Sequence, residues 1–363
     1  MTLYMGVDFH PYTQTVAWCN TKDGEIKFRT FKHSDKKTLN SFYKGLGEPA
    51  VIGVEATGGL DWFERMIFEN GHEFLVGHPY EIRRRALSRH KSDRRDAETL
   101  LDLLMNGEFP KLWRRSERDQ ATLQLLNFRQ HLIGQRTRVA NQLQALARKA
   151  GLARFQVKTK VGRSILLAAE LNETDSYLRE RLLVLFDTLS EQLSQVEARL
   201  DEAFAETETA QRLATHPGVG YLTALALTAT LGDVSRFGNT RKVAGFVGLD
   251  PLDGSTGEKH RIGKISKKGS RLCRYLLGQA AQRSSDRRIR ISYSQIRSRR
   301  GHAIAKVAIA RRLLVNCYVM MRDNIDYAEF CRRGVKLACT REPLAPDTSD
   351  CSVRDGAASH FGT

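Results

Sequence analysis

The sequence has few cysteines and no long apolar run, and each shortage excludes a class of protein. Its six cysteines form no CxxC pair and no zinc-ligand spacing, and five of them follow residue 270. A disulfide framework for the whole chain is therefore not expected. No apolar region typical of a secretion signal and no uncharged stretch of membrane-spanning length is present. The sequence thus indicates a reduced, cytoplasmic setting.

Acidic residues are also scarce relative to basic ones. The chain of 363 residues carries 58 Lys and Arg against 41 Asp and Glu, a formal net charge of +17. The excess is concentrated, because residues 261–322 hold seventeen basic residues and a single acid, Asp286. Residues 170–208 reverse the balance, with eleven acids and three arginines. Such asymmetry is typical of a surface that binds a polyanion, since neutralising phosphates releases counterions.

The first eighty residues alternate strand patterns with turns and helices. Residues 3–10, 13–21 and 25–33 read as three successive strands, the last two joined by a hairpin turn at Lys22-Asp23-Gly24. Helices are predicted at 36–46 and 60–70, each followed by another strand, at 50–56 and 72–79. This order predicts a mixed α/β sheet in which the first and fourth strands are central neighbours.

Four carboxylates accompany these elements. Asp8 and Glu55 end two buried strands, whereas Asp93 and Asp96 lie three apart on one face of a predicted helix. Any one of them alone reads best as a solvated loop residue or a helix cap. Together they match the oxygen ligands that Mg²⁺ prefers, and paired Mg²⁺ ions suit phosphoryl transfer on nucleic acid.

The middle of the chain is predicted to be helical. Apolar spacing favours helix over residues 93–150, a basic irregular stretch at 151–165, and a long amphipathic helix over 180–209. That last helix fits either a coiled-coil arm for self-association or a helix packed on its own domain. Gly218-Val219-Gly220 fits either an ordinary turn or a helix-hairpin-helix element, whose backbone N–H groups hold DNA phosphates. The tail beyond residue 342 is predicted to be disordered.

A second candidate site follows the Gly-Val-Gly turn. Ser255 lies in the turn-forming segment Asp253-Gly254-Ser255-Thr256-Gly257, which by itself indicates no more than a turn residue. Dense basic residues follow it and would stabilise a pentavalent phosphoryl transition state. They are Arg261, Lys264, Lys267, Lys268, Arg271 and Arg274.

Taken together these segments resemble a known family. MGVDFH, GVEATG, HKSDRRDAETL, HPGVGYLTA, AGFVGLDPLDGSTGEK and IGKISKKGSRLCRYLL occur in the order found in the bridge-RNA-guided transposases, family one-ten of the insertion sequences. The resemblance covers roughly residues 3 to 320. It implies a RuvC-like RNase H domain at 1–150, a helical linker or coiled-coil arm at 151–210, a serine transposase domain at 211–328 and a tail at 329–363.

The resemblance also implies the chemistry and the partners. Asp8, Glu55, Asp93 and Asp96 would bind Mg²⁺, and Ser255 rather than Thr256 would form a transient phosphoserine link to DNA. A guide RNA would pair with target and donor DNA, and the chain would act as a dimer or tetramer near the nucleoid. Candidate nucleic-acid contacts are Arg83, Arg84, Arg85, Arg94, Arg95, Gly218, Gly220 and the basic residues after Ser255.

Two other functions fit the same residues. A RuvC-like, structure-selective endonuclease would use the four acids to direct water at a phosphate, with Ser255 only a turn residue. A non-catalytic nucleic-acid scaffold would bind tightly and salt-sensitively without changing any strand.

Overall fold

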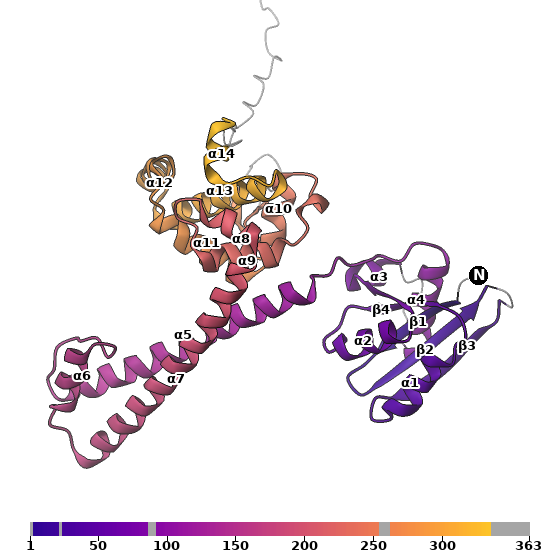
Figure 1. Ribbon diagram of the computed structural model, residues 1–363, viewed down its shortest axis with the longest axis horizontal. Coiled ribbons are helices and arrows are strands. Elements are labelled where there is room, and N and C mark those ends of the chain that lie inside the picture. The colour runs from indigo at the N-terminus through magenta and orange to yellow at the C-terminus, as the bar shows by residue number, and fades with distance from the viewer. Residues whose placement is uncertain (1–2, 22–23, 86–91, 254–261, 335–363) are drawn as a thin grey trace, which may run out of the picture. The chain divides into compact units, whose positions relative to one another are not determined.

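The computed structural model describes residues 3–21, 24–85, 92–253 and 262–334 (Figure 1). Packing divides the chain into two compact units, with the boundary between Arg114 and Arg115. Most of the predicted turn at 22–24 and the tail from residue 335 lie outside the described residues.

The N-terminal unit is built on a five-stranded sheet. Its strands are β1 (Leu3–Phe9), β2 (Thr13–Asn20), β3 (Ile26–Lys32), β4 (Ala50–Glu55) and β5 (Glu73–Gly77), in the spatial order β3-β2-β1-β4-β5. The first three strands pair antiparallel, whereas β4 runs parallel to both β1 and β5. The predicted mixed sheet is confirmed, and this order is that of a RuvC-like RNase H fold.

Helices cover both faces of the sheet. On one face α1 (Lys36–Lys44) and α2 (Asp61–Glu69) pack against alternate residues of β1, including Met5 and Val7. On the other face lies α4 (Asp93–Met105), which meets β1 at Gly6. A Cβ at Gly6 would lie 2.1 Å from the backbone oxygen of Ala97, so only glycine allows this close approach. Because side chains alternate along a strand, Asp8 projects on the same face as Gly6.

The stretch over 93–150 is mostly helical, as its pattern predicts, but it forms two helices rather than one. After α4 ends at Met105, Gly107 adopts a φ of 70°, which favours glycine, and α5 starts only at Glu117. The intervening segment adds to the sheet edge, where Leu112 N–H donates to the carbonyl of Val76. Before α4 the unit also contains α3 (Pro79–Arg85). The Gly and Pro signals of 106–110 were readable in the sequence.

The second unit begins with two long antiparallel helices, α5 (Glu117–Lys149) and α7 (Glu173–Ala205). Their antiparallel register shows in three ion pairs along their length: Arg118 with Glu206, Arg129 with Glu197 and Lys149 with Asp175. The short helix α6 (Lys160–Leu167) packs where α5 ends. The apolar face of α7 thus packs on α5 of the same chain.

The first turns of α7 precede the predicted start at residue 180. Asn172 caps this helix by accepting a hydrogen bond from the backbone N–H of Asp175, and Glu173 and Asp175 lie in the first turn. Acids there interact favourably with the helix dipole. The cap and the acidic first turn were therefore sequence signals for an earlier start.

The rest of the unit is mainly helical around a buried α9. Its elements are α8 (Glu208–Ala214), α9 (Tyr221–Leu231), η1 (Val234–Arg236), α10 (Thr240–Val247), β6 (Pro251–Asp253), β7 (Ile262–Ile265), α11 (Arg271–Arg283), α12 (Arg287–Arg300), α13 (His302–Arg322) and α14 (Tyr327–Arg332). Helices α9, α11 and α13 supply most of the apolar core. Among the described helices, none is both long and apolar enough to cross a membrane.

Candidate functional site

The candidate site of the N-terminal unit lies where β1 and β4 end. In the parallel register Val7 pairs with Val54, so the next residues, Asp8 and Glu55, lie on neighbouring strands. Both side chains project on the face that α4 covers, because Gly6 and Gly53 of that face contact residues of α4. The predicted adjacency of these two strand-end acids is confirmed.

The other two acids lie in the first turn of α4. Ser92 caps this helix, its hydroxyl accepting from the N–H of Arg95, so that Asp93 and Asp96 come directly after the cap. The positive end of the helix dipole favours carboxylates at this position. Close packing of α4 on Gly6 then brings this helix start toward Asp8.

Asp8 and Asp93 come together around a residue that the sequence reasoning missed. The Nε2–H group of His10 donates to Asp8 Oδ2 at 3.0 Å, and Nε2 lies 3.7 Å from Asp93 Oδ1. Among the described residues, Asp8, His10 and Asp93 form a group whose potential ligand atoms all lie within 4.8 Å of one another. The signal for His10 was its spacing, since a residue two after Asp8 projects on the same side of an extended chain.

Electrostatics at Asp8 also reflect this gathering of acids. Burial raises the pKa of Asp8, and the nearby carboxylates of Asp96 and Asp93 raise it further. The imidazole of His10 acts in the opposite direction. Asp96 therefore lies close enough to act on Asp8, although it is outside the three-residue group. Concentrated negative charge of this kind is stabilised by a cation.

Glu55 is held differently. Its carboxylate accepts a hydrogen bond from Arg83 Nη2 of α3 at 3.3 Å, and it is not in the group around His10. The Glu55 side chain is 37% exposed and that of Arg83 is 70% exposed, so the pair is weak. The structure thus brings two of the four predicted acids, Asp8 and Asp93, into one group, and it places Asp96 near enough to raise the pKa of Asp8. The fourth acid, Glu55, has an arginine partner instead.

The arginines predicted to contact nucleic acid in this unit are all exposed, but several have partners. Arg84 pairs with Glu81 at 3.9 Å, and Arg85 donates to the carbonyl of Glu108. The guanidinium of Arg94 lies 4.0 Å from the ring centre of Phe28. The backbone N–H of Arg95 donates to the hydroxyl of Ser92, and the Arg95 side chain is exposed to solvent.

The donor set fits a divalent metal ion. Asp8 and Asp93 offer carboxylate oxygens on a strand end and a helix start, and His10 offers a ring nitrogen. Asp96, one helical turn after Asp93, offers a further carboxylate near Asp8. Hard cations such as Mg²⁺ prefer carboxylate oxygens as ligands. An imidazole nitrogen also binds transition metals, Mn²⁺ more weakly than Zn²⁺. A group able to hold a metal is therefore present at this edge of the sheet.

Ser255 and Arg261 lie outside the described residues, as does the whole of 254–261. The strands on either side are described, and β6 pairs antiparallel with β7 through Asp253 and Ile262. Lys264 lies on β7 and is exposed.

The basic segment after β7 is anchored by its backbone. Ser266 N–H donates to the carbonyl of Asp250, and Lys267 N–H to that of Gly248. A Cβ at Gly269 would lie 1.9 Å from the backbone oxygen of Phe246, so this segment lies directly against the end of α10. Exposed basic side chains project from this fixed backbone at Lys267, Lys268 and Arg271.

Arg274 differs from its neighbours because it is partly buried. Its Nη1 group donates to the backbone carbonyls of Val247 at 2.9 Å and Gly269 at 2.6 Å. The guanidinium therefore ties α11 to the end of α10 and to the basic segment. Its contact with nucleic acid stays a prediction, whereas its role in holding this segment is a feature of the structure.

The Gly-Val-Gly turn lies in the short connection between α8 and α9. Gly218 has a φ of 108°, and a Cβ there would lie 2.7 Å from three atoms of Ser284. Gly220 has an ordinary φ and no atom within 4 Å of such a Cβ. Gly218 is thus required by packing, and a phosphate contact at either glycine stays a prediction.

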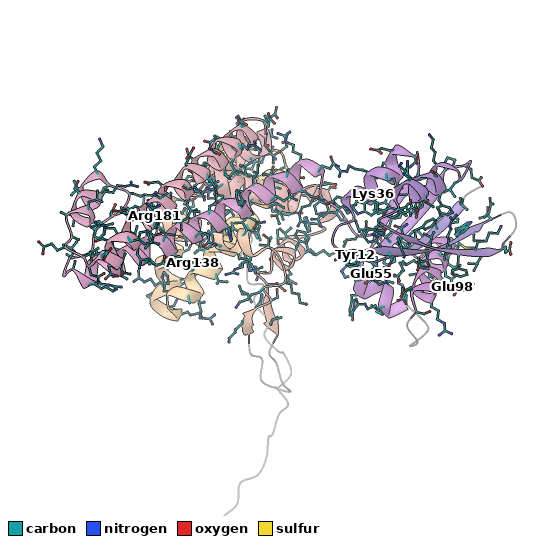
Figure 2. All side chains as sticks on the ribbon, turned by 90° about the horizontal axis from the view of Figure 1, so that it is seen from below. Tyr12, Lys36, Glu55, Glu98, Arg138 and Arg181 are labelled. Atoms are coloured by element: carbon teal, nitrogen blue, oxygen red, sulfur yellow. The ribbon has the colours of Figure 1, made fainter. Side chains whose placement is uncertain are left out.

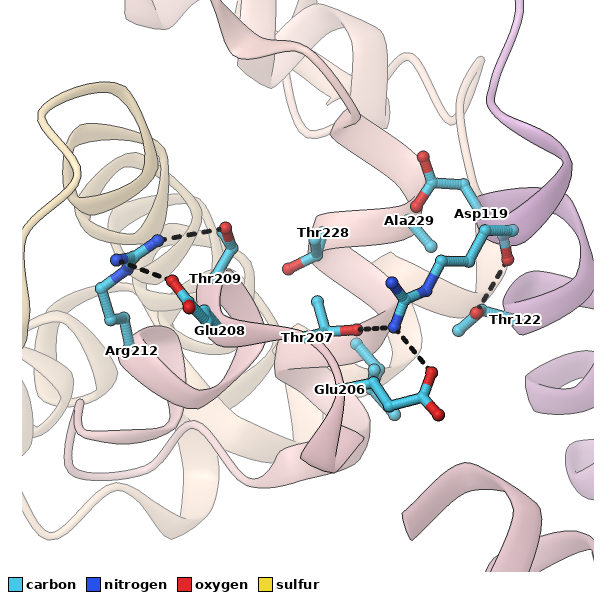
Figure 3. Close-up of a pocket in the computed structure, with 11 residues that line it drawn as sticks. Asp119, Thr122, Glu206, Thr207, Glu208, Thr209, Arg212, Thr228 and Ala229 are labelled. Carbon is cyan, nitrogen blue, oxygen red and sulfur yellow. Dashed lines mark hydrogen bonds and ion pairs between the residues drawn. The ribbon is translucent and has the colours of Figure 1, made fainter. Parts of the chain in front are cut away.

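A polar pocket of about 280 Å³ lies elsewhere in the second unit, between the ends of α5, α7 and α8 (Figure 3). Arg118 bridges Glu206 and Thr207 in it, and Arg212 contacts Glu208 and Thr209. The charged groups that line the pocket are largely paired with one another, and these contacts hold the helix ends together.

An RNase H fold that gathers carboxylates at the ends of β1 and α4 defines a phosphoryl-transfer enzyme acting on nucleic acid. Comparison with known proteins agrees and is more specific. Residues 5–150 match the family model of the DEDD transposases of IS110 type, and residues 210–296 match that of the transposase IS116/IS110/IS902 family.

Curated proteins that are similar to most of this chain are also named as transposases of insertion sequences. The transposase for insertion sequence element IS1328 of Yersinia enterocolitica is 31% identical over 267 residues, covering 73% of this chain and 78% of the relative. The transposase for IS1111A of Coxiella burnetii is 28% identical, covering 64% of this chain and 65% of the relative. The chain belongs to the IS116/IS110/IS902 transposase family and is a DNA transposase.

Proposed function

We propose that this transposase is an RNA-guided recombinase that moves its insertion sequence through a covalent phosphoserine intermediate. The acidic group at Asp8, Asp93 and Asp96, joined by Glu55, would hold Mg²⁺, and Ser255 would be the nucleophile. The observation that supports it best is the gathering of acids from β1 and α4 at one edge of an RNase H sheet, within a chain that also matches the C-terminal transposase family model.

The metal would supply charge stabilisation at the phosphate. Mg²⁺ coordinated by carboxylates neutralises the negative charge that develops on phosphate oxygens during displacement. The residues of the chain have their own tasks. Asp8 on β1 and Asp93 on α4 would hold the site between a strand and a helix, and His10 orients the Asp8 carboxylate through its hydrogen bond. Glu55 joins the set once it leaves Arg83, a weak exposed pair.

The proposed covalent step is a displacement at phosphorus. The Oγ atom of Ser255 loses its proton and forms a bond to a DNA phosphate, and the bond between phosphorus and the 3′ oxygen breaks. The departing strand leaves with a free 3′-hydroxyl. After strand exchange a 3′-hydroxyl attacks the phosphoserine, restoring the diester and the serine hydroxyl. The basic segment with Lys267, Lys268 and Arg271, whose backbone is anchored by hydrogen bonds, would face the phosphate charge.

The partners follow from the same proposal. A guide RNA would select target and donor DNA by base pairing, so that the protein mainly grips backbones. Two or four copies would bring the acidic group and Ser255 of different protomers to one DNA joint. The expected cytoplasmic, nucleoid-associated setting belongs to this proposal too.

The second candidate function is a metal-dependent, structure-selective endonuclease. It is favoured by the same acidic group and needs nothing from Ser255, because water would be the nucleophile. The two functions differ in one product. The recombinase passes through DNA covalently linked to protein, and the endonuclease does not.

A covalent-trapping assay separates them. Purified chain with its co-purifying RNA is mixed with Mg²⁺ and labelled DNA that spans an element junction and a target, and the products are run on a denaturing gel. We expect a protein-linked DNA band in wild type that is absent in Ser255→Ala and present in the neighbouring control Thr256→Ala. Asp8→Asn should abolish all strand changes.

Cleavage without a linked band, equal in wild type and Ser255→Ala, would establish the endonuclease and demote Ser255 to a turn residue. Recombination lost in Asp8→Asn but retained in Ser255→Ala would likewise contradict the serine step. Ribonuclease treatment before the assay tests the guide, because RNA-guided recombination must then stop while metal binding persists.

A further inference from the structure

Helix α12 (Arg287–Arg300) carries a strong positive charge that no neighbouring helix balances. Six of its fourteen residues are arginine and none is acidic. Helices α11 and α13, which flank it in sequence, contain no Asp or Glu either. Within residues 262–334, no carboxylate lies within ion-pair distance of an α12 arginine. Asp286 caps the helix and is occupied by backbone N–H groups and by Tyr327.

The inner face of α12 is firmly attached to the rest of the unit. Ile289 is only 1% exposed, and Arg312 of α13 donates to the hydroxyl of Ser292 at 2.6 Å. Tyr293 bonds His302 at the start of α13 through a 2.7 Å contact. These contacts fix which side of α12 faces solvent. The charge on the outer side is therefore displayed on a rigid helix.

The outer face has a definite pattern. With about 100° per residue, Ile291, Ser294, Gln295 and Ser298 form one exposed stripe along the helix, and Arg287 lies at its N-terminal end. Arg288 and Arg299 lie about 90° to one side of that stripe. Arg290 and Arg297 lie about 90° to the other side. All of these side chains are exposed, so beyond Arg287 short polar and apolar groups form a central band bordered by arginines on both flanks.

This pattern fits the major groove of duplex DNA. The groove of B-DNA is about 12 Å wide and admits one α-helix, with a phosphate backbone along each rim. Arginines on both flanks would meet the two backbones, and the central band would face the base edges. Gln, Ser and Ile are short enough there to contact bases or the thymine methyl. The major groove of A-form RNA is too narrow for a helix, so duplex RNA fits this face less well.

We propose that α12 binds duplex DNA in the major groove, with Arg288, Arg290, Arg297 and Arg299 on the phosphates. The inference rests on DNA being the substrate of this family and extends the proposed function, but it needs neither Ser255 nor a guide RNA. Like charges spaced three apart, as at Arg287 and Arg290, repel within a helix. A bound polyanion offsets that repulsion, which explains why the arginines of α12 need no acidic partners in the chain.

Binding without chemistry tests the proposal. The full chain is titrated against a labelled 24-base-pair DNA duplex, and against RNA of equal sequence, in EDTA at several salt concentrations. For Arg290→Gln/Arg297→Gln we expect DNA affinity to fall and the slope of log K against log salt to shrink by about 2, one per lost phosphate contact. The matched control is Arg138→Gln/Arg181→Gln, two exposed arginines of α5 and α7 (Figure 2).

Methylation of guanine N7 shows which groove the helix occupies, because N7 lies in the major groove and a bound helix protects it. We expect protection in wild type and in the control, and its loss in the α12 variant. An unchanged salt slope, an equal loss in the control, or a loss confined to RNA would each overturn the proposal. Should that variant fail to fold, Arg288→Gln/Arg299→Gln probes the other flank. Ser255→Ala should bind as wild type, so failure of the covalent step is separable.

Discussion

Replacing Gly6 by alanine should disrupt the acidic site without touching any acid. A Cβ at residue 6 would lie 2.1 Å from the backbone oxygen of Ala97 and 2.5 Å from the backbone nitrogen of Leu101. Both atoms belong to the backbone of α4, so no side-chain rotation can relieve the clash. Helix α4 must retreat by roughly 1 Å, since close-packed interiors leave no slack. Overpacking of this kind costs about 1–3 kcal/mol of stability.

The retreat also carries Asp93 and Asp96 away from Asp8. A misplacement of roughly 1 Å in a catalytic constellation lowers rates by on the order of 100-fold. We therefore expect Gly6→Ala to weaken Mn²⁺ binding, measured by calorimetry, and to slow Mg²⁺-dependent strand transfer by that factor. The loss in activity should exceed what partial unfolding explains, because the folded fraction stays high at 25 °C.

The matched control is the same substitution in α5. Gly134 lies inside that helix, and a Cβ added there would have no atom within 4 Å. Gly134→Ala should therefore stabilise the fold by roughly 0.5–1 kcal/mol. Unfolding by urea and strand transfer are measured for both variants. If Gly6→Ala keeps wild-type stability and wild-type metal affinity, α4 does not position the acidic site as argued.

Three further predictions concern the second unit. Burial lowers the pKa of His216 below 6.5, so the unfolded chain takes up a proton that the folded chain does not. Unfolding free energy should fall from pH 7 to pH 5 in wild type and less in His216→Gln, by urea titration at both pH values. Asp175→Asn should cost roughly 1.5–3 kcal/mol in the same assay, because buried Asp175 accepts from Lys149 at 2.8 Å. Gly218→Ala should lower the thermal midpoint and Gly220→Ala should not, because only Gly218 has a positive φ and a contact at 2.7 Å; equal midpoints would contradict a packing role.

Much of the N-terminal unit followed from local pattern. The antiparallel order of the first three strands and the strand–helix–strand units that follow were readable from alternation and turns. That order places Asp8 beside Glu55, because parallel strands on either side of a crossover end at the same edge. The sequence also placed Asp93 and Asp96 on one helix face.

What the sequence could not supply was the contact between distant elements. Nothing local in MGVDFH says that Gly6 is where α4 packs, although that contact brings Asp93 toward Asp8. The ion pair of Glu55 with Arg83 likewise joins residues on different elements. Helix boundaries failed for another reason. The apolar pattern of 93–150 did not mark the break between α4 and α5, which only the Gly and Pro residues of 106–110 signalled.

These contacts divide the acidic site into a rigid side and an adjustable side. Asp8 and Asp93 are placed by backbone packing, which holds α4 against β1 with no side chain between them at Gly6. Glu55 is instead restrained by one exposed guanidinium, a pair worth about 0–1 kcal/mol. Under the proposed function, a cation held by the group would offset that amount, so bringing Glu55 into the group would cost little and would free Arg83. Arg83 would then be available to pair with a substrate phosphate, which would couple assembly of the fourth carboxylate to arrival of the substrate.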